Sequence, residues 1–396
     1  MGLLFDILSV IFWLSGAALF WTYFGYPLLM YVLAKVAPKA IHKDASLKPS
    51  VTMVIPAYNE ADVIGRKLAN TLQIDYPKDK LQVLVIDDGS TDDTVKIIEE
   101  YVPRGITLLR QPTRGGKMGA VNMGFANATG EIVILSDASP DYERSALNIL
   151  LQPFADEKVG VVVGTLALWD AKNAVARPAG LYWKYEAALR KWESRTGNTV
   201  AVHGNMFAIR RTLFKPLKTG TVNDEFSIAM EAIRQGYRVV YEPDAISYDD
   251  ASASMRDEFK RRVRINAGRF QALFSAGYLR APTLDTGFRL FSHKLLRPLT
   301  PVFMLLALAT NLLAFLWPSA GLLALNGALG MLTLLAQAVF YLLSFLGYMA
   351  EKRGRGHRLL NVPYYFTSSN LAALVGFWRW LRGTQKVTWQ KREAAN

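Results

Sequence analysis

Residues 83–90 read VLVIDDGS, and residues 132–139 read IVILSDAS. In each stretch an apolar run rich in valine and isoleucine ends at or next to an acid, a pattern typical of a buried parallel strand. In an open α/β sheet, ligands bind beyond the carboxyl ends of such strands, so these acids face one crevice. Like charges that converge there require a metal ion or a cationic partner. The two stretches therefore predict a site for a metal-bound, phosphorylated ligand.

Strand and helix patterns alternate through residues 49–250. We expect strands at residues 51–55, 81–86, 106–109, 132–135, 159–166 and 238–241. We expect helices at residues 61–72, 92–101, 117–126, 144–151, 180–195 and 226–235. This order predicts an α/β domain with a doubly wound, mostly parallel sheet. Because no G-x-G-x-x-G follows the first strand and Gly116-Lys117 lacks the other P-loop residues, both common nucleotide-binding templates are excluded.

Composition limits the cofactors and partners. The chain has no cysteine, which excludes disulfides and thiolate zinc sites, and its 4 histidines are scattered. Any metal would therefore be held by oxygen atoms, as Mg²⁺ or Mn²⁺ prefer. The formal charge is +13, but the bases cluster beside apolar stretches in the way that the positive-inside rule describes. The basicity thus indicates a lipid bilayer, and not nucleic acid, as the partner.

Three apolar stretches are long enough to cross a bilayer, at residues 7–36, 299–317 and 321–350. The third is longer than a straight crossing needs, so we expect a tilt or a break near residues 326–330. Basic flanks place residues 37–297 and 351–396 in the cytoplasm and the short turn at 318–320 outside. Residues 364–381 are apolar and aromatic but end in bases, which favours an interfacial or re-entrant helix over a fourth crossing.

Six motifs, each weak alone, resemble a known family in their order and spacing. They are Pro56-Ala57-Tyr58-Asn59-Glu60, Asp87-Asp88-Gly89-Ser90, Gly116-Lys117, Asp137-Ala138-Ser139, Asn223-Asp224-Glu225 and the arginines of residues 261–264. Together they resemble the inverting family 2 glycosyltransferases of GT-A fold, specifically the membrane-embedded bacterial polysaccharide synthases. The resemblance covers nearly the whole chain.

The resemblance also implies a division of the chain. Residues 1–36 would form an amino-terminal transmembrane anchor and residues 37–254 a cytoplasmic GT-A domain. Basic interfacial helices would follow at residues 255–297, two transmembrane helices at 298–350, and a cytoplasmic or interfacial end at 351–396. The catalytic domain would then lie on the cytoplasmic side of a bacterial inner membrane.

The resemblance implies that a divalent ion, Mg²⁺ or Mn²⁺, is held against both phosphates of a nucleotide-sugar donor. Asp137 matches the first acid of the family's D-x-D motif, and Ser139 stands at its third position. A hydroxyl is a weaker ligand than a carboxylate, so metal binding at Ser139 is expected to depart from the family pattern. The structural alternative for Asp137 is a cap on the helix expected at residues 144–151.

The same resemblance implies which residues contact the donor. Asp87 and Asp88 match the motif at the nucleoside, and the segment with Pro56, Tyr58 and Glu60 matches the motif at the base. Lys117 is placed at the diphosphate, since Gly115 and Gly116 allow a close backbone approach. The alternatives are a capped turn at the two acids and a solvated lysine.

Inversion by single displacement requires one base that accepts the proton of the acceptor hydroxyl. Asp224 matches the family's catalytic acid; alternatively, it is an acid that the dipole favours at a helix amino terminus. The segment His203-Gly204-Asn205 matches the acceptor-side loop, and a packed histidine is the alternative there.

Two arginines on the helix expected at residues 255–274 are candidates for a pyrophosphate grip. Arg261 and Arg264 are three residues apart and share a face. Processive family members carry Q-x-x-R-W here, whereas this chain has RRVRI at residues 261–265. The missing tryptophan argues against long-chain processivity, and contact with anionic lipid is the alternative for these arginines.

These features predict a membrane-bound, metal-dependent, inverting hexosyltransferase. Its donor is expected to be a UDP-linked sugar, and its acceptor a polysaccharide or a lipid-linked glycan, as in exopolysaccharide biosynthesis. The first alternative is single-sugar transfer to polyprenyl phosphate or a polyprenyl-linked oligosaccharide. The second is a non-catalytic nucleotide-binding subunit of an exopolysaccharide secretion complex. Because three spans are few for a pore, an export partner or a homo-oligomer is also expected.

Overall fold

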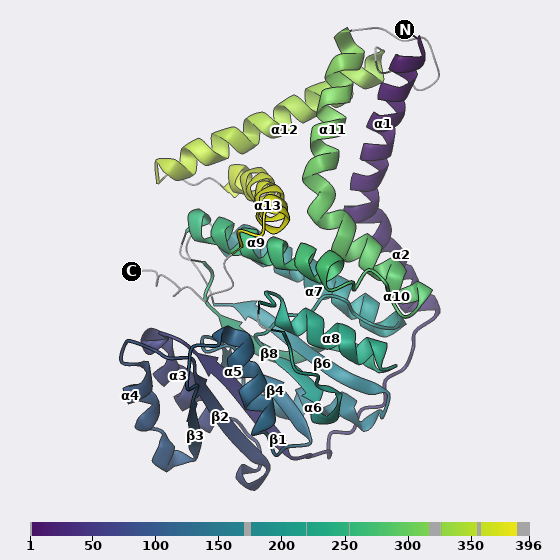
Figure 1. The fold of residues 1–396 in the computed structure, drawn as a ribbon. Coiled ribbons are helices and arrows are strands. Elements are labelled where there is room, and N and C mark those ends of the chain that lie inside the picture. The colour runs from purple at the N-terminus through teal and green to yellow at the C-terminus, as the bar shows by residue number, and fades with distance from the viewer. Residues whose placement is uncertain are drawn as a thin grey trace.

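The computed structural model describes residues 2–169, 176–218, 220–252, 254–316, 325, 327–354 and 358–385. Figure 1 shows an α/β domain at one end of the molecule and long helices at the other, with α7 and α9 between them. The chain enters through the helical end, forms the α/β domain, and returns to the helices.

The α/β domain contains a sheet of eight strands in the order β3-β2-β1-β4-β7-β6-β8-β5. Their bounds are β1 Val51–Ala57, β2 Leu81–Asp87, β3 Ile106–Arg110, β4 Ile132–Leu135, β5 Asp141–Tyr142, β6 Val159–Leu168, β7 Phe207–Arg210 and β8 Arg238–Asp249. The β1–β2, β2–β3, β1–β4 and β6–β8 pairs are parallel, which confirms the mostly parallel sheet. Strands β7 and β5 run antiparallel to their neighbours and were not predicted.

Helices cover both faces of this sheet. They are α3 Ala61–Leu72, α4 Thr94–Glu99, α5 Gly116–Ala126, α6 Ala146–Leu151, α7 Ala176–Thr196 and α8 Asp224–Arg234. Side chains alternate between the faces of a strand. In β1, Met53 and Ile55 therefore belong to the core under α3 and α6, and Val54 to the core under α5 and α8. Helix α4 begins two residues later than expected because Asp92 Oδ1 accepts hydrogen bonds from the backbone and hydroxyl of Thr94.

Three stretches are long and apolar enough to cross a membrane, judged by length and composition among the described residues: Asp6–Val36, Leu284–Leu316 and Ala328–Lys352. The first consists of α1 (Gly2–Phe20), a π-helical turn (Trp21–Gly25) and α2 (Tyr26–Val36). The second consists of α10 (Leu284–Arg289), a π-helical segment (Leu290–Leu295) and α11 (Leu296–Leu316), so its helix begins earlier than expected. The third, α12 (Ala328–Lys352), begins within the expected break. The turn expected at residues 318–320 lies outside the described residues.

Helix α13 (Arg358–Leu381) is not among these apolar stretches. Figure 1 shows it almost end-on beside α9 (Met255–Phe270), across the direction of α1 and α11. It packs on α9 through aromatic rings, with the Phe270 and Phe377 centroids 5.1 Å apart. This direction supports the interfacial placement expected for residues 364–381, which stays a prediction.

Candidate active site

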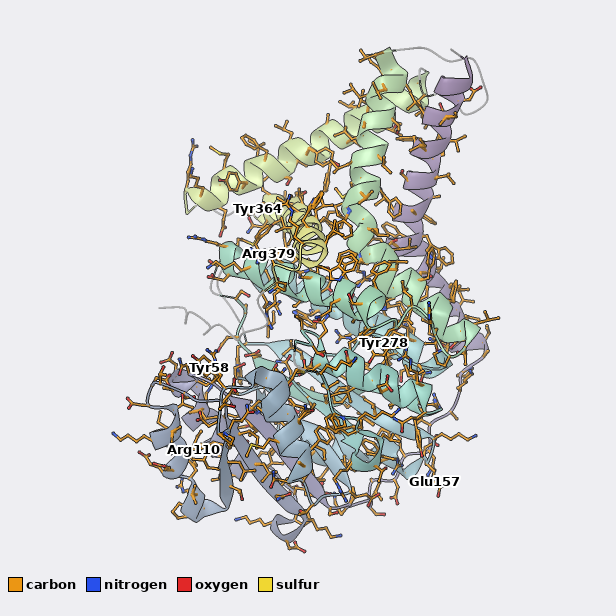
Figure 2. All side chains as sticks on the ribbon, in the orientation of Figure 1. Tyr58, Arg110, Glu157, Tyr278, Tyr364 and Arg379 are labelled. Atoms are coloured by element: carbon orange, nitrogen blue, oxygen red, sulfur yellow. The ribbon has the colours of Figure 1, made fainter. Side chains whose placement is uncertain are left out.

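A cavity of about 1890 Å³ lies between the α/β domain and the long helices. The predicted site residues that line it are Glu60, Lys117, Asp137, Ser139, His203, Gly204, Asn205, Asp224, Arg261 and Arg264. Figure 2 shows Tyr58 at the edge of the α/β domain that faces α9, and Arg379, which also lines the cavity, on the side of the long helices. Pro56, Tyr58, Asp87 and Asp88 do not line it.

Three carboxylates surround one lysine at the wall of this cavity. Asp137 follows β4, Asp224 and Glu225 form the first turn of α8, and Lys117 lies in the first turn of α5. The Lys117 Nζ atom is 3.0 Å from Asp137 Oδ1, 3.1 Å from Asp224 Oδ2 and 2.8 Å from Glu225 Oε1. We call these four residues the Lys117 cluster. The cluster brings together residues from three of the six motifs, and in it a single cation faces three acidic side chains.

The Lys117 cluster shifts the proton affinities of its members. Burial, and then the charge of Asp224, raise the pKa of Glu225 to about 8. Burial by itself would lower the pKa of Lys117, but the three carboxylates raise it well above its usual value. Glu225 thus carries a proton at neutral pH, and Lys117 is an ammonium. Our sequence reasoning gave Glu225 no role, although its place beside Asp224 was the available signal.

The high pKa of Glu225 makes stability depend on pH. The pKa of Glu225 is 4.5 in the unfolded chain and about 8 in the folded protein. Between these two pH values the folded state therefore binds more protons than the unfolded state. Its contribution to the free energy of unfolding is complete below about pH 4.5 and is lost as the pH rises through about 8. We expect the melting temperature in detergent to fall over this window, and to fall less in Glu225→Gln. An identical slope for both proteins would contradict the assignment.

Gly204 leaves space between two members of the Lys117 cluster. A Cβ atom at this position would lie 2.0 Å from Glu225 Oε1 and 3.3 Å from Asp137 Oδ2. The backbone N–H of Asp137 donates to the carbonyl of Gly204 at 3.3 Å, which fixes this approach. A side chain at this position would therefore displace the Glu225 carboxylate and crowd that of Asp137.

We expect Gly204→Ala to lower the catalytic rate roughly ten- to a hundredfold, because the methyl group displaces Glu225 and crowds Asp137. The measurement is the steady-state rate of nucleoside diphosphate release. Gly180→Ala is the matched control, since a Cβ atom at Gly180 meets nothing within 4 Å. Equal rates for the two variants would show that this space has no catalytic importance.

Asp137 suits a divalent ion that also takes ligands from a substrate. Among the described residues, no group of three or more histidine, cysteine or acidic side chains is arranged to hold a metal by itself. Mg²⁺ usually binds through one or two carboxylates together with substrate phosphates, so this does not argue against it. The acidic side chains of the Lys117 cluster outnumber its one cation, which leaves oxygen ligands in excess. Ser139 lines the same cavity, and its carbonyl accepts from Arg66 Nη2 at 3.0 Å.

Asp87 and Asp88 bond to backbone groups of the α/β domain. Asp87 accepts from the N–H groups of Gly89 and Ser90, which is the capped turn. Asp88 is fully buried, and its Oδ1 accepts from Gln111 Nε2, Gly115 N and Gly116 N at 2.7, 2.8 and 3.0 Å. It thereby fixes the start of α5, which carries Lys117. Ligand contact by either acid stays a prediction.

Tyr58 and Pro56 also lie outside the cavity lining. The guanidinium of Arg114 lies 3.7 Å from the ring centroid of Tyr58, a cation–π contact. Pro56 is a buried residue of β1. Of this motif, Glu60 lines the cavity, and its backbone N–H donates to Thr94 Oγ1 at 2.8 Å.

His203 is a packed, neutral histidine. Its Nε2 atom lies 3.1 Å from the carbonyl of Gly164, and burial, followed by the charge of Arg190, lowers its pKa to about 3. Asn205 Nδ2 donates to Asp249 Oδ2 at 3.1 Å. The loop at residues 203–205 thus lines the cavity as expected but is held by the α/β domain.

The two predicted arginines of α9 differ in their surroundings. Arg261 forms an ion pair with Glu258 at 2.9 Å, and Arg262 bonds to the same carboxylate at 2.7 Å. Burial would raise the pKa of Glu258, but these two arginines hold it well below its usual range. Arg264 is exposed and lines the cavity. A role for both in binding pyrophosphate stays a prediction, and our sequence reasoning missed Glu258.

The comparison with known families defines the class of this protein. Residues 52–217 match the family described as Glycosyl transferase family 2, and residues 136–350 match Glycosyl transferase family group 2. The second match covers more than half of the chain. The chain therefore belongs to glycosyltransferase family 2, and its α/β domain has the GT-A fold.

Individual relatives are named for different products. The chain is 28% identical over 220 residues to the beta-monoglucosyldiacylglycerol synthase of Synechocystis sp., covering 52% of this chain and 46% of that protein. It is 24% identical over 230 residues to the poly-beta-1,6-N-acetyl-D-glucosamine synthase of Staphylococcus aureus, covering 56% and 55%. The chain spans about half the length of the curated relatives it matches.

A solved structure matches over a much larger share. It is the mannosyltransferase PcManGT of Pyrobaculum calidifontis in complex with GDP-Man and Mn²⁺, with a TM-score of 0.72 and 25% identity. The alignment covers 94% of this chain and 99% of that one. The likeness thus extends beyond the α/β domain.

Proposed function

We propose that this protein is a membrane-bound, metal-dependent, inverting glycosyltransferase that moves a hexose from a nucleotide-sugar donor to a glycan acceptor at the cytoplasmic face of the membrane. The observation that carries the proposal is the Lys117 cluster at the wall of the cavity. Such a donor leaves as a nucleoside diphosphate, so the site must stabilise growing negative charge. The complex of PcManGT with GDP-Man and Mn²⁺ supports this reading and adds GDP to UDP as a candidate nucleotide.

The four residues of the Lys117 cluster take different roles in this proposal. Asp137 would hold Mg²⁺ or Mn²⁺ together with the donor phosphates, and the bound ion would supply Lewis acidity to the leaving group. The Lys117 ammonium, now shared by three carboxylates, can donate to a phosphate oxygen. Asp224 accepts the proton of the acceptor hydroxyl. Glu225, which is protonated at neutral pH, limits the negative charge beside that base.

A panel of donors tests the proposal directly. Full-length protein in detergent is given UDP-glucose, UDP-N-acetylglucosamine or GDP-mannose with Mn²⁺ or Mg²⁺, and nucleoside diphosphate release is measured. We expect turnover of at least one donor and its loss when EDTA removes the ion. Consumption of donor at an unchanged rate in EDTA would contradict the metal requirement. Binding of donor without any turnover would favour the non-catalytic alternative.

One feature of α9 favours single-sugar transfer over polymer synthesis. The helix has Arg261 and Ile265 where processive members carry the glutamine and tryptophan of Q-x-x-R-W. Product sizing separates the two reactions, because single transfer adds one sugar to each acceptor and a processive enzyme makes material of high mass. We expect single addition.

A further inference from the structure

The part of the cavity nearest the long helices is rich in arginine and lysine. Its bases come from three elements of the fold, α7, α9 and the second apolar stretch. We call this set the arginine pocket, and its members are Arg190, Arg262, Arg269, Lys294 and Arg297. Figure 1 places these elements at the junction between the α/β domain and the long helices.

The acids of this region do not balance the bases. Among the described residues, the ion pairs of the arginine pocket involve only Glu186 and Glu258. Glu186 contacts Arg297 and lies 3.9 Å from Arg190 Nη2. The pocket is therefore positive, whereas the Lys117 cluster in the same cavity has more carboxylates than cations.

The charges of four arginines of the pocket act on the phenol of Tyr182. Burial would raise the pKa of this phenol, but the charges of Arg297, Arg262, Arg269 and Arg190 together lower it. The Arg262 guanidinium lies 4.7 Å from the Tyr182 ring centroid. Four positive groups thus act on one point, as expected of a site for a compact anion.

Arg190 supplies the second, independent observation. Its side chain is only 5% exposed, and its Nε–H group is buried with no hydrogen-bond partner. A buried guanidinium donor without a partner is costly, because its water is lost and not replaced. Arg–phosphate pairs satisfy such donors two at a time.

The same cavity continues to the apolar helices. Its lining includes Tyr23 from the first apolar stretch and Val362, Phe366 and Ala373 from α13. The Tyr23 and Phe366 rings lie 5.3 Å apart. Aromatic and aliphatic side chains of the first apolar stretch and of α13 therefore form part of the wall of the same cavity.

We propose that the arginine pocket binds the phosphate or diphosphate of a lipid-linked acceptor, whose apolar chain leaves between the first apolar stretch and α13. The inference rests on the proposed function, since it names the acceptor class for that transfer. The donor diphosphate is assigned to the acidic part of the same cavity, where Asp137 and Lys117 lie. In this arrangement the acceptor phosphate and the donor diphosphate bind in the same cavity but to different cationic groups.

Binding in the absence of donor tests this inference. Full-length protein in detergent is titrated with farnesyl phosphate, with the neutral alcohol farnesol and with inorganic phosphate. We expect farnesyl phosphate to bind at least about tenfold more tightly than either of the others, because only it offers both the anion and the chain. Equal affinity for farnesol would overturn the charge argument. Inorganic phosphate that binds as tightly as farnesyl phosphate would assign the pocket to a free anion and overturn the lipid.

Variants assign the binding to the pocket. We expect Arg190→Gln and Arg269→Gln each to weaken farnesyl phosphate roughly ten- to a hundredfold by removing a charge-assisted hydrogen bond. The conservative Arg269→Lys should recover part of the affinity. Lys191→Gln and Arg256→Gln change exposed bases on the same two helices and should have no effect. Melting curves confirm folding, and unchanged affinity in folded Arg190→Gln and Arg269→Gln would overturn the proposal.

Donor turnover is measured separately, so the two hypotheses fail in different ways. Turnover without a preference for farnesyl phosphate over farnesol overturns the acceptor inference and leaves the transferase intact. A preference that depends on Arg190, in a protein that consumes no donor of the panel, overturns the proposed function and supports a lipid-phosphate site.

Discussion

Replacing Asp224 with asparagine will lower the transfer rate by roughly two to four orders of magnitude, the usual contribution of a general base. The amide has nearly the size of the carboxylate and keeps an oxygen for Lys117, which lies 3.1 Å from Asp224 Oδ2. It cannot accept the proton of the acceptor hydroxyl. The effect should therefore fall on kcat, with a smaller change in the KM of the donor. The measurement is steady-state product formation with a saturating acceptor.

Asp244→Asn is the matched control for this change. Asp244 is an exposed residue of β8 that does not line the cavity, so its variant should have the rate of the unmodified protein. If Asp224→Asn keeps the full rate while Asp137→Asn loses it, the base is a different group.

The sequence predicted the sheet well wherever the strands are buried on both faces. Residues 132–135 form β4 with the predicted limits, and every residue of β1 is buried. A fully buried strand has a continuous apolar pattern that is visible without its neighbours. The antiparallel strand β7 is only Phe207–Arg210, and β5 is only Asp141–Tyr142. Segments this short have too few residues for a periodic pattern, and only their pairing partners define them.

The sequence predicted several of the residues that line the cavity, but not the contacts between them. Asp137 lines the cavity, as its position after a predicted strand indicated. The reason is that β1 and β4 are parallel, so their carboxyl ends meet at one edge of the sheet. Asp88 directly follows β2 at the same edge, yet it bonds to the backbone at Gly115 and Gly116. A sequence does not tell whether a strand-end acid faces a ligand or a neighbouring loop. That choice depends on the path of the loop at residues 111–116.

The arginine pocket shows the same limit for charges. The positive-inside rule explained bases beside apolar stretches as a matter of topology. It gave no sign that Arg190 of α7, Arg269 of α9 and Lys294 of the second apolar stretch line one cavity. About 80 positions separate Arg190 from Arg269, and about 25 separate Arg269 from Lys294. Only the docking of the long helices on the α/β domain brings these residues together.

Replacing Lys117 with methionine will lower the free energy of unfolding by about 3 kcal/mol or more, the usual cost of removing one partner from a buried ion pair. The lysine side chain is 22% exposed, and it is the cation of three carboxylates that lie within 3.1 Å of its Nζ atom. Without it, the carboxylates of Asp137 and Asp224 repel each other in a partly dry environment, beside a protonated Glu225. The measurement is the midpoint of thermal or chemical unfolding of the full-length protein in detergent at neutral pH.

The double variant Lys117→Met/Asp137→Asn separates repulsion from lost packing, because Asp137 is one of the carboxylates that Lys117 faces. Removing one carboxylate should return much of the lost stability if repulsion is the cause, whereas a packing defect would persist. Lys158→Met changes an exposed lysine and should leave the midpoint unchanged. A Lys117→Met midpoint equal to that of Lys158→Met would mean that water or ions already balance the three acids. Lowering the pH should also rescue Lys117→Met, because protonation removes the repelling charges, and this rescue should be absent from Lys158→Met.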